Sequence, residues 1–574
     1  MAATLPLAVW QRASATLPVP SGLPAHLGVG LAAHPDNSGI YGWMPNSGIP
    51  FDYAYQYLAS GVNTGQGWQT WNASAQFPLW YAQGASSHGY TPVFPYYQLL
   101  QSNGPCNSCG EAQRDLANLN SPTLMLSYFA DFRMLMRRLG GGTWDGIAGY
   151  GKTAVVHVEP DLSGYAEQAA LFSSLCYGFC TGTGNDASVV KASVANSGFG
   201  EVASYANTFR GFMLALQHLR DLYAPNVLLA FHVSDWATGQ DIGSSTDPSL
   251  DAAAYGRQAG QFAVSAGAGG YDLVFNDVAD RDAGYYEHVV GKNVWWDKLN
   301  VGLPNFKRWE QYLGAVTSTV GRSAMVWQIP LGNQWFDTVN NTDGHYQDNR
   351  AEYFFGHMAE LQQIGVIGVL YGAGAGGPTT NTDDKADGVT NPASFCTTRG
   401  VSSGQVCNNH TSTVSDDDGG YLRMATANYY KAPLPVGSTT TTTTVGSTTT
   451  TTKPTTTTTT RPPTTTTTAP RDTTPPAAPK VTSPTSSVKT RASTYTIKGT
   501  AEAAALVRIW VDTNGNGRLD AGEPVAASQK LGAEVTSWSM TVNLAMRTNR
   551  FVVTATDAAG NQSAAALVPF ITRH

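Results

Sequence analysis

Eight short apolar runs recur along the first part of the chain, separated by longer segments that mix apolar and polar residues. Short runs bounded by Gly, Pro and polar residues predict β-strands, and the amphipathic stretches between them predict α-helices. Alternation of strands with helices is typical of a parallel α/β fold. The predicted strands span residues 27–33, 53–62, 91–97, 154–159, 227–233, 271–276, 323–329 and 366–371, of which the second is the least well defined.

Four segments between these runs predict helices. Ser121 and Pro122 supply an N-cap and a proline at the first helical position, which predicts a helix over 123–139. Apolar residues at intervals of three and four predict a second helix over 204–223. The remaining two helices are predicted over 306–316 and 350–363.

Eight strands with this alternation, over about 400 residues, predict a (β/α)8 barrel of the TIM type with long loops at one end. An open, doubly wound sheet is the alternative. That fold would place a Gly-rich phosphate-binding turn after the first strand, where this chain has Ala33-His34-Pro35-Asp36. The pattern therefore favours the α/β barrel.

A segment of low complexity separates the predicted barrel from the C-terminal part of the chain. Residues 437–477 are mostly Thr with scattered Pro, Lys and Arg. Such a segment has too few apolar groups to offset the entropy of ordering, so we expect a disordered linker. The predicted domains are a barrel over 1–436, this linker over 437–477 and an accessory β-domain over 478–574.

Composition excludes two classes of function. Only 13% of the 574 residues are charged, and the formal net charge is −7. This balance lacks the basic surface that binding of DNA or RNA requires, so no nucleic-acid partner is expected. No apolar run reaches the ~18 residues of a membrane-spanning helix, so no transmembrane segment is expected either.

The six cysteines fall into pairs that are close in sequence: Cys106 with Cys109, Cys176 with Cys180, and Cys396 with Cys407. An even number of cysteines in loop-like segments predicts three short disulfides and hence a secreted protein. A redox or zinc motif is the alternative for the first pair, but zinc would need a second matching pair with nearby His. The N-terminus lacks the features of a signal peptide, so we expect that one was removed.

Residues that can carry chemistry gather at the ends of the predicted strands. In a (β/α)8 barrel, functional side chains project from the C-terminal ends of the strands, where the βα loops converge. A purely structural barrel has little reason to collect carboxylates, imidazoles, amides and aromatic rings there. The residues are His34 and Asp36; Tyr96, Tyr97 and Gln98; His157, Glu159 and Asp161; His232, Asp235 and Trp236; Asn276, Asp277, Asp280 and Asp282; and Trp327 and Gln328.

Glu159 is the candidate general acid. Side chains alternate along a strand, so His157, Glu159 and Asp161 are predicted to share one direction at the mouth of the barrel. A partly desolvated carboxyl group has a raised pKa, which suits a proton donor. Hydrolysis of a glycoside needs a second carboxylate, for which Asp277 and Asp161 are the candidates. The alternative is a structural Glu held by a buried Arg or His.

Other strand-end residues are candidates for substrate binding, because aromatic rings stack on sugar faces while polar groups bind hydroxyls. Structural roles are the alternative, since Asp235 can cap a segment and both His can be interior hydrogen-bonding groups. No HxH or HExxH spacing supports a catalytic metal, so no catalytic cofactor is expected. The predicted substrate-binding residues are Asp36, Tyr97, His157, His232, Asp235, Trp236, Asn276, Trp327 and Gln328.

With Glu159 closing the fourth strand, residues 20–430 resemble the (β/α)8 glycoside hydrolases, in which a catalytic Glu ends that strand. Val158-Glu159-Pro160-Asp161 is also similar to the Glu-Pro-Asp strand of certain cellobiohydrolases and endoglucanases. The large retaining clan of these enzymes places its nucleophilic Glu at the end of the seventh strand. This chain has Gln328 there and so departs from that clan.

The C-terminal part, residues 478–574, resembles bacterial Ig-like modules. Short alternating strands are predicted within 495–501, 507–511 and 551–561. Residues 512–523 match the twelve-position calcium loop, with Gly517 at the sharp turn. The flanking segments are strands, so Ca²⁺ would stiffen a β-sandwich. The predicted metal ligands are Asp512, Asn514, Asn516, Arg518, Asp520 and Glu523.

Two functions fit these observations. The first is a secreted glycoside hydrolase, expected to be a monomer, that acts on a polysaccharide or oligosaccharide by carboxylate acid–base catalysis. The second is a barrel without hydrolytic activity that binds carbohydrate or attaches to a surface. The carboxylates and aromatic residues at the mouth favour the first function, and the missing Glu on the seventh strand favours the second. The fold alone does not decide between them.

Overall fold

The computed structural model describes residues 17–35, 40–279, 281–332, 346–372, 419–437, 474–512, 516–519, 523, 525–532, 535–557 and 561–574. The chain divides into two compact units, residues 1–445 and 446–574. Each unit is described by itself.

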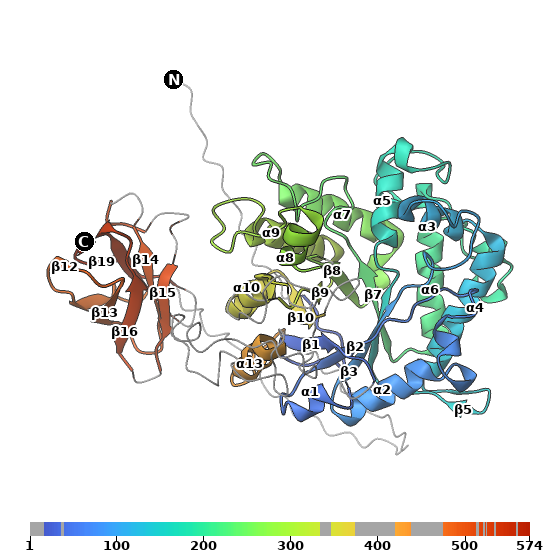
Figure 1. Ribbon diagram of the computed structural model, residues 1–574, viewed down its shortest axis with the longest axis horizontal. Helices are drawn as coiled ribbons and strands as arrows, with labels where there is room; N and C mark the ends of the chain where they lie inside the picture. Colours follow the sequence, from blue (N-terminus) through green and yellow to red (C-terminus); the bar gives the residue numbers. More distant parts are fainter. Residues whose placement is uncertain are drawn as a thin grey trace, which may run out of the picture. The chain divides into compact units, whose positions relative to one another are not determined.

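The first unit is a closed barrel of eight parallel strands, which confirms the predicted fold (Figure 1). Neighbouring strands pair in the order β1-β10-β9-β8-β7-β6-β3-β2, and β1 pairs with both β2 and β10 to close the ring. The strands are β1 (Gly28–Ala32), β2 (Tyr53–Tyr55), β3 (Thr91–Tyr96), β6 (Ala154–Val158), β7 (Val227–His232), β8 (Leu273–Asp277), β9 (Ala324–Ile329) and β10 (Val366–Tyr371).

Helices surround this barrel. The α-helices are α1 (Trp43–Asn46), α2 (Phe77–Ser87), α3 (Glu111–Leu119), α4 (Pro122–Leu139), α5 (Leu162–Leu171), α6 (Phe209–Tyr223), α7 (Ala252–Ala266), α8 (Ala283–Tyr285), α9 (Phe306–Val320), α10 (Arg350–Gly356), α11 (Met358–Gln363) and α13 (Gly419–Tyr429). Short 3-10 helices are η1 (Trp68–Thr70), η2 (Ala73–Ala75), η3 (Ser173–Leu175), η4 (Ala187–Val189), η5 (Ala195–Ser197), η6 (Gly200–Val202) and η7 (Ala268–Gly270), and η8 (Tyr286–Val290) is a π-helix. A small hairpin pairs β4 (Thr143–Trp144) with β5 (Ile147–Ala148).

Local capping explains where the predicted helices begin and end. The Ser121 hydroxyl accepts a hydrogen bond from the Leu124 N–H, as the predicted N-cap of α4 requires. Helix α6 begins at Phe209, not at residue 204, because the Thr208 hydroxyl caps the Gly211 N–H. The predicted helix over 350–363 is divided at His357 into α10 and α11.

The second unit is all-β. Its sheets have the orders β11-β13-β16, β12-β20-β17 and β15-β14-β18-β19. Buried and exposed residues alternate along β13 and β16, so one face of their sheet packs on a small apolar core. The strands are β11 (Lys480–Ser483), β12 (Val488–Thr490), β13 (Thr494–Thr500), β14 (Leu506–Val511), β15 (Val525–Lys530), β16 (Ser537–Asn543), β17 (Arg547–Asn549), β18 (Phe551–Thr556), β19 (Ala566–Leu567) and β20 (Ile571–Arg573).

Two of the three predicted disulfides are present, Cys106–Cys109 and Cys176–Cys180. The third predicted pair, Cys396 and Cys407, lies outside the described residues, as does most of the predicted linker. Within the described part of the chain, none of the helices has the length and apolar character that a membrane span needs.

Candidate active site

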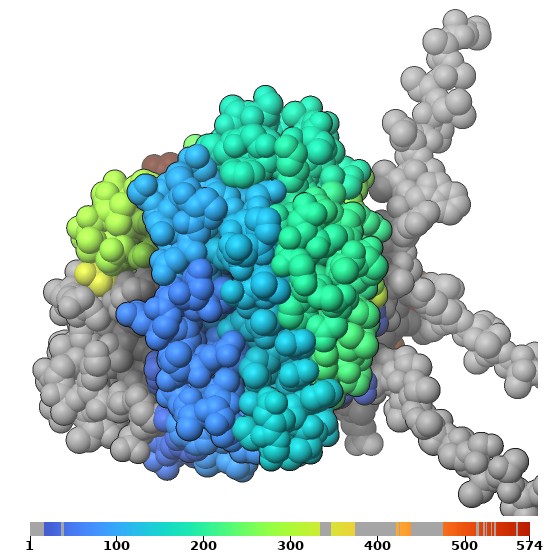
Figure 2. Space-filling model, turned by 90° about the vertical axis from the view of Figure 1, so that its right-hand side faces the viewer, coloured from blue at the N-terminus to red at the C-terminus, as the bar shows by residue number. Residues whose placement is uncertain are grey.

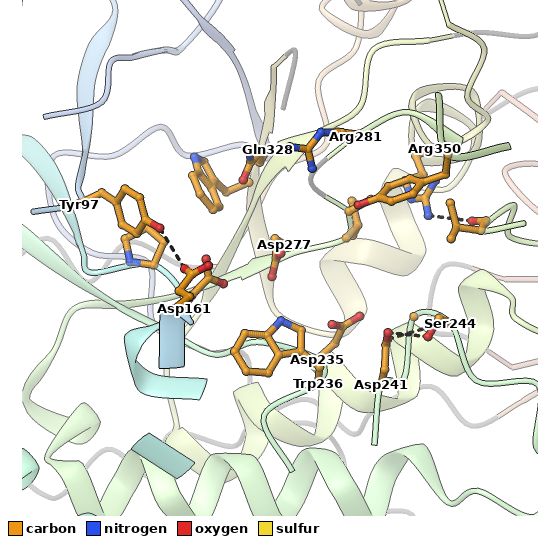
Figure 3. Close-up of a pocket in the computed structure, with 18 of the residues that line it drawn as sticks. Tyr97, Asp161, Asp235, Trp236, Asp241, Ser244, Asp277, Arg281, Gln328 and Arg350 are labelled. Carbon is orange, nitrogen blue, oxygen red and sulfur yellow. Dashed lines mark hydrogen bonds between the residues drawn. The ribbon is translucent and has the colours of Figure 1, made fainter. Parts of the chain in front are cut away.

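A cavity of about 1240 Å³ opens at the C-terminal ends of the barrel strands, where functional side chains were expected (Figure 3). Its wall is formed by residues at or just beyond the ends of six strands. These are Tyr57 and Ala59 after β2, Tyr97 and Gln101 after β3, Pro160 and Asp161 after β6, Asp235 and Trp236 after β7, Asp277, Val278 and Ala279 at β8, and Trp327 and Gln328 in β9.

Two histidines lie inside the barrel below this cavity. His157 on β6 and His232 on β7 are fully buried, and the His157 Nε2 atom lies 2.9 Å from the His232 Nδ1 atom. The His157 ring stacks on Phe275 with 4.4 Å between ring centroids and meets Trp327 edge-on at 4.8 Å. Burial lowers the pKa of His232 to about 3 and that of His157 well below 6.5. Both rings are therefore neutral at physiological pH.

The hydrogen bonds of the His pair fix a donor at the cavity floor. The His232 Nε2 atom lies 3.0 Å from the Ser234 Oγ, 3.6 Å from an oxygen of Asp277 and 4.0 Å from an oxygen of Asp161. A neutral imidazole carries one N–H, and the two nearby carboxylates favour its placement on Nε2. We therefore assign His157 Nε2 as the donor to His232 Nδ1 and His232 Nε2–H as the donor to the Ser234 Oγ, with both carboxylates beyond hydrogen-bond distance of this nitrogen.

Asp235 is the buried carboxyl group of the cavity wall. Its side chain is almost fully buried, and burial raises its pKa well above 3.8. The neighbouring carboxylates of Asp241 and Asp277 raise the pKa further, while the Arg350 guanidinium opposes them. A Cβ atom at Gly243 would lie 2.6 Å from an Asp235 carboxyl oxygen, so the glycine leaves room for this group. Asp235 is thus a buried acid on the cavity wall.

Asp277 and Asp161 are the accessible carboxylates beside it. Asp277 ends β8 and Asp161 precedes α5, with side chains 16% and 33% exposed. In Figure 3, Asp277 lies near the centre of the cavity, with Asp161 on one side and Asp235 on the other. Because both approach His232 Nε2, their nearest oxygens are separated by at most the sum of 3.6 and 4.0 Å.

Glu159 does not share the direction of His157 and Asp161, in contrast to the expectation from strand alternation. Strand β6 ends at Val158, and Glu159 and Asp161 have φ angles of +41° and +72°, which end the extended conformation. Glu159 is 3% exposed and is not among the residues of the cavity wall. Its carboxyl group accepts hydrogen bonds from the Tyr128 hydroxyl at 2.7 Å and from the N–H groups of Gln98 and Leu99.

These contacts hold the end of β3 against α4 and β6. Burial raises the pKa of Glu159 to about 7, and the three hydrogen bonds partly oppose this rise. A raised pKa alone therefore does not identify the catalytic acid here, because the group has no access to the cavity.

The other predicted residues divide into two groups. Tyr97, Asp235, Trp236, Trp327 and Gln328 line the cavity, together with Asp161 and Asp277. His157, His232 and Asn276 are fully buried and do not line it. The Asn276 amide donates to the Val233 carbonyl and accepts from the Trp309 indole, which is a structural contact. Asp36 lies outside the described residues.

Several residues of the cavity wall were not predicted, because they belong to loops and helices, not to strand ends. Glu111 opens α3 directly after the Cys106–Cys109 disulfide and accepts a 3.0 Å hydrogen bond from the Tyr97 hydroxyl. In the sequence, the pair Cys106 and Cys109 was the signal that a disulfide restrains this loop. The others with charged or aromatic side chains are Tyr57, Tyr165, Asp241, Arg281, Tyr286, Lys292 and Arg350.

Aromatic rings form two faces of the cavity. Tyr165 and Trp236 lie 4.7 Å apart between ring centroids, and Tyr57 and Trp327 lie 5.7 Å apart. Amide groups of Gln101, Asn293 and Gln328 also line the cavity. Rings with polar groups between them suit a ligand that has apolar faces and hydroxylated edges, as sugars do.

No protein-family model and no curated protein matches the sequence. Among solved structures, the chain is similar to a modular endo-β-1,4-mannanase from Cellulomonas fimi, at 11% identity and a TM-score of 0.34, over 96% of this chain and 94% of that one. It is also similar to an endo-glycoceramidase II from Rhodococcus sp., at 9% identity and a TM-score of 0.34, over 92% and 100% of the two chains. An exo-β-1,4-mannosidase from Opitutaceae bacterium strain TAV5 matches 60% of this chain and 52% of its own, at 12% identity and a TM-score of 0.29. Similarities at this level show nothing about the activity of this chain.

Proposed function

We propose that this protein is a secreted glycoside hydrolase whose active site is the cavity at the mouth of the barrel. The observation that carries the proposal is the placement of Asp235, a buried carboxyl group whose pKa is raised by burial and by neighbouring carboxylates, on the same wall as Asp277. Cleavage of a glycosidic bond requires such a pair, with one carboxylic acid to protonate the leaving oxygen and one carboxylate to act on the sugar. The aromatic faces of the cavity would hold the sugar rings.

In this mechanism Asp235 donates the proton and Asp277 is the carboxylate partner. His232 Nε2 hydrogen-bonds Ser234 and lies 3.6 Å from Asp277 and 4.0 Å from Asp161, so the neutral ring would adjoin them without adding a positive charge. Asp161 is the alternative partner, since it also lines the cavity. Glu159, the first candidate for the acid, would instead support the loop that carries Tyr97.

The test begins with a reducing-sugar screen of neutral and acidic polysaccharides, followed by Asp235→Asn and Asp277→Asn on the polymer that is cleaved. Loss of a general acid or base typically lowers turnover ~10²–10⁴-fold. An activated aryl glycoside of the same sugar needs little protonation, so Asp235→Asn should retain far more activity on it than Asp277→Asn does. Equal losses on both substrates would contradict the assignment of the acid.

The alternative function is carbohydrate binding without cleavage, for which the neutral Gln328 at the end of β9 is the specific observation. The same screen decides between the two. Binding of a glycan with no release of reducing ends, at any pH at which the protein is folded, would favour this second function.

We propose in addition that residues 512–523 of the second unit bind a structural Ca²⁺ ion. Asp512 and Glu523, the first and last positions of the loop motif, are only 5% and 6% exposed. The Asp512 carboxylate accepts the N–H groups of Asn516 and Gly517, and Gly517 has a φ of +74°, as the sharp turn requires. Arg518 would contribute its backbone carbonyl. Asn514 and Asp520 lie outside the described residues.

A further inference from the structure

A row of aromatic rings runs along the outside of the barrel over helix α2, away from the cavity. The order is Trp71, Phe77, Trp80, Tyr41 and His88, and successive ring centroids are 4.8, 6.0, 5.8 and 6.4 Å apart. We call these five residues the aromatic row. Trp71, Trp80 and Tyr41 are 37%, 43% and 38% exposed, His88 is also exposed, and Phe77 is buried beneath them.

The middle of the row is held by a glycine inside the helix. Trp80 and Gly84 lie on one face of α2, and His88, the residue that caps the end of this helix, continues the same spacing of four residues. The Tyr41 ring lies directly on Gly84, where an added Cβ atom would come within 2.9 Å of the ring. Glycine disfavours helix formation relative to alanine. Its presence in the third turn therefore allows the Tyr41 ring to lie between Trp80 and His88.

The segment that carries most of the row is polar but uncharged, and the charged groups next to it include the buried Arg138, which donates to the Ser74 carbonyl, and its ion-pair partner Asp145. From residue 53 to residue 110 the sequence contains no Asp, Glu, Lys or Arg. The exposed neighbours of the row on α2 are Gln83 and Ser87, which offer amide and hydroxyl groups. The blue N-terminal segment forms part of the outer surface in Figure 2, and none of the five rings lines the cavity.

We infer that the aromatic row is a second binding site, for a single chain of a neutral polysaccharide. Successive exposed rings, with amide and hydroxyl groups beside them, match the apolar faces and hydroxylated edges of successive sugars. Lys and Arg are absent from residues 53–110, and the neighbouring Arg138 is buried and paired with Asp145, which argues against an anionic polymer, a nucleic acid or an anionic membrane as the ligand. The Tyr41 and Trp80 planes differ by 41° and the Phe77 and Trp80 planes by 61°. Rings tilted in this way suit one twisting chain and not the flat face of a crystalline polymer.

The inference shares its class of ligand with the proposed function, but its test requires no catalysis. Full-length protein carrying Asp235→Asn, which prevents cleavage, is run on native gels that contain galactomannan, hydroxyethyl cellulose, arabinoxylan or mixed-linkage β-glucan. Retardation is compared for the Trp71→Ala/Trp80→Ala double variant and for Phe172→Ala, a control residue that is 39% exposed elsewhere on the barrel. Saturating short oligosaccharide is added to occupy the cavity.

We expect retardation in at least one gel, and a dissociation constant about tenfold or more higher in the double variant, with Phe172→Ala unchanged. Gly84→Ala should also weaken binding, because its Cβ atom displaces Tyr41 while the helix is preserved. No retardation of the parent protein in any gel, or equal retardation of the parent and the double variant, would overturn the inference. The double variant is also made in the protein that retains Asp235, and its cleavage of short oligosaccharides is measured in the reducing-sugar assay. Unchanged cleavage there, together with weaker binding in the gels, would show that this site is separate from the cavity.

Discussion

Glu159→Gln separates a structural from a catalytic role at the end of β6. The Glu159 carboxyl group accepts the Tyr128 hydroxyl at 2.7 Å and the N–H groups of Gln98 and Leu99 at 3.2–3.3 Å. A glutamine has one carbonyl oxygen for these three donors, and its own amide group would face at least one of them. Leaving a buried donor unsatisfied costs about 1–3 kcal/mol. We therefore expect the variant to have a free energy of unfolding lower by about that amount, with turnover nearly unchanged.

The size of this effect should depend on pH. Burial raises the pKa of Glu159 from 4.5 to about 7 in the folded protein. The folded state thus retains a proton that the unfolded state releases, so the wild-type protein loses stability as the pH rises from about 4.5 to 7. A shift of this size corresponds to about 3 kcal/mol. Glutamine does not titrate, so the difference in stability between wild type and variant should be largest near pH 4.5 and should shrink toward pH 7.

Urea unfolding followed by tryptophan fluorescence at pH 5 and at pH 7.5, with turnover measured at both values, checks both expectations. Asp235→Asn is the matched comparison, because it also replaces a buried carboxyl by an amide but lies on the cavity wall. A Glu159→Gln protein with wild-type stability at pH 5 and turnover reduced ~10²-fold or more would refute the structural role and identify Glu159 as the acid.

Three further predictions concern other parts of the molecule. Asp235→Asn should remove the decline of activity on the alkaline side of the pH profile, because the raised pKa of Asp235 sets that limb; an unchanged limb would assign it to another group. Chelation of Ca²⁺ should lower the melting temperature of the second unit in calorimetry of the full chain and leave the barrel transition nearly unchanged. Asp512→Ala should abolish this response to chelation, and a persistent response would reject the loop. Intact-mass measurement without reductant should show the loss of four hydrogens for the two observed disulfides, and of six if Cys396 and Cys407 are also paired.

The barrel could be predicted because its strands leave a strong local signal. Each strand is a short apolar run, and seven of the eight predicted runs coincide with an observed strand within two residues at each end. The second run, predicted over 53–62, is a strand only at Tyr53–Tyr55. Helix α2 was missed because its residues are buried around most of its circumference and because it contains Pro78 and Gly84, so no polar stripe or helical propensity marks it.

The location of the site could be predicted, but the role of one residue in it could not. Strand ends meet at the mouth of a barrel whatever their sequence, so Asp161, Asp235 and Asp277 were correctly placed beside one another. The direction of Glu159 depends on a positive φ angle, which sequence alternation does not reveal. Arg281 and Arg350 reach the cavity from loop and helix positions that carry no periodic signal.

A single physical cause sets the charge states of the two groups on which the mechanism depends. Removal from water disfavours the charged form of any group, so it raises the pKa of Asp235 and lowers that of His232 to about 3. Burial therefore favours the neutral form of both groups, the protonated carboxyl group of Asp235 and the unprotonated ring of His232. A cationic His232 beside Asp277 would favour ionisation of the nearby Asp235 and weaken it as a proton donor. Because the ring is neutral, His232 can lie 3.6 Å from Asp277 and 4.0 Å from Asp161, with its Nε2 hydrogen-bonded to Ser234, without that loss, which explains why a histidine can lie under an acid–base pair.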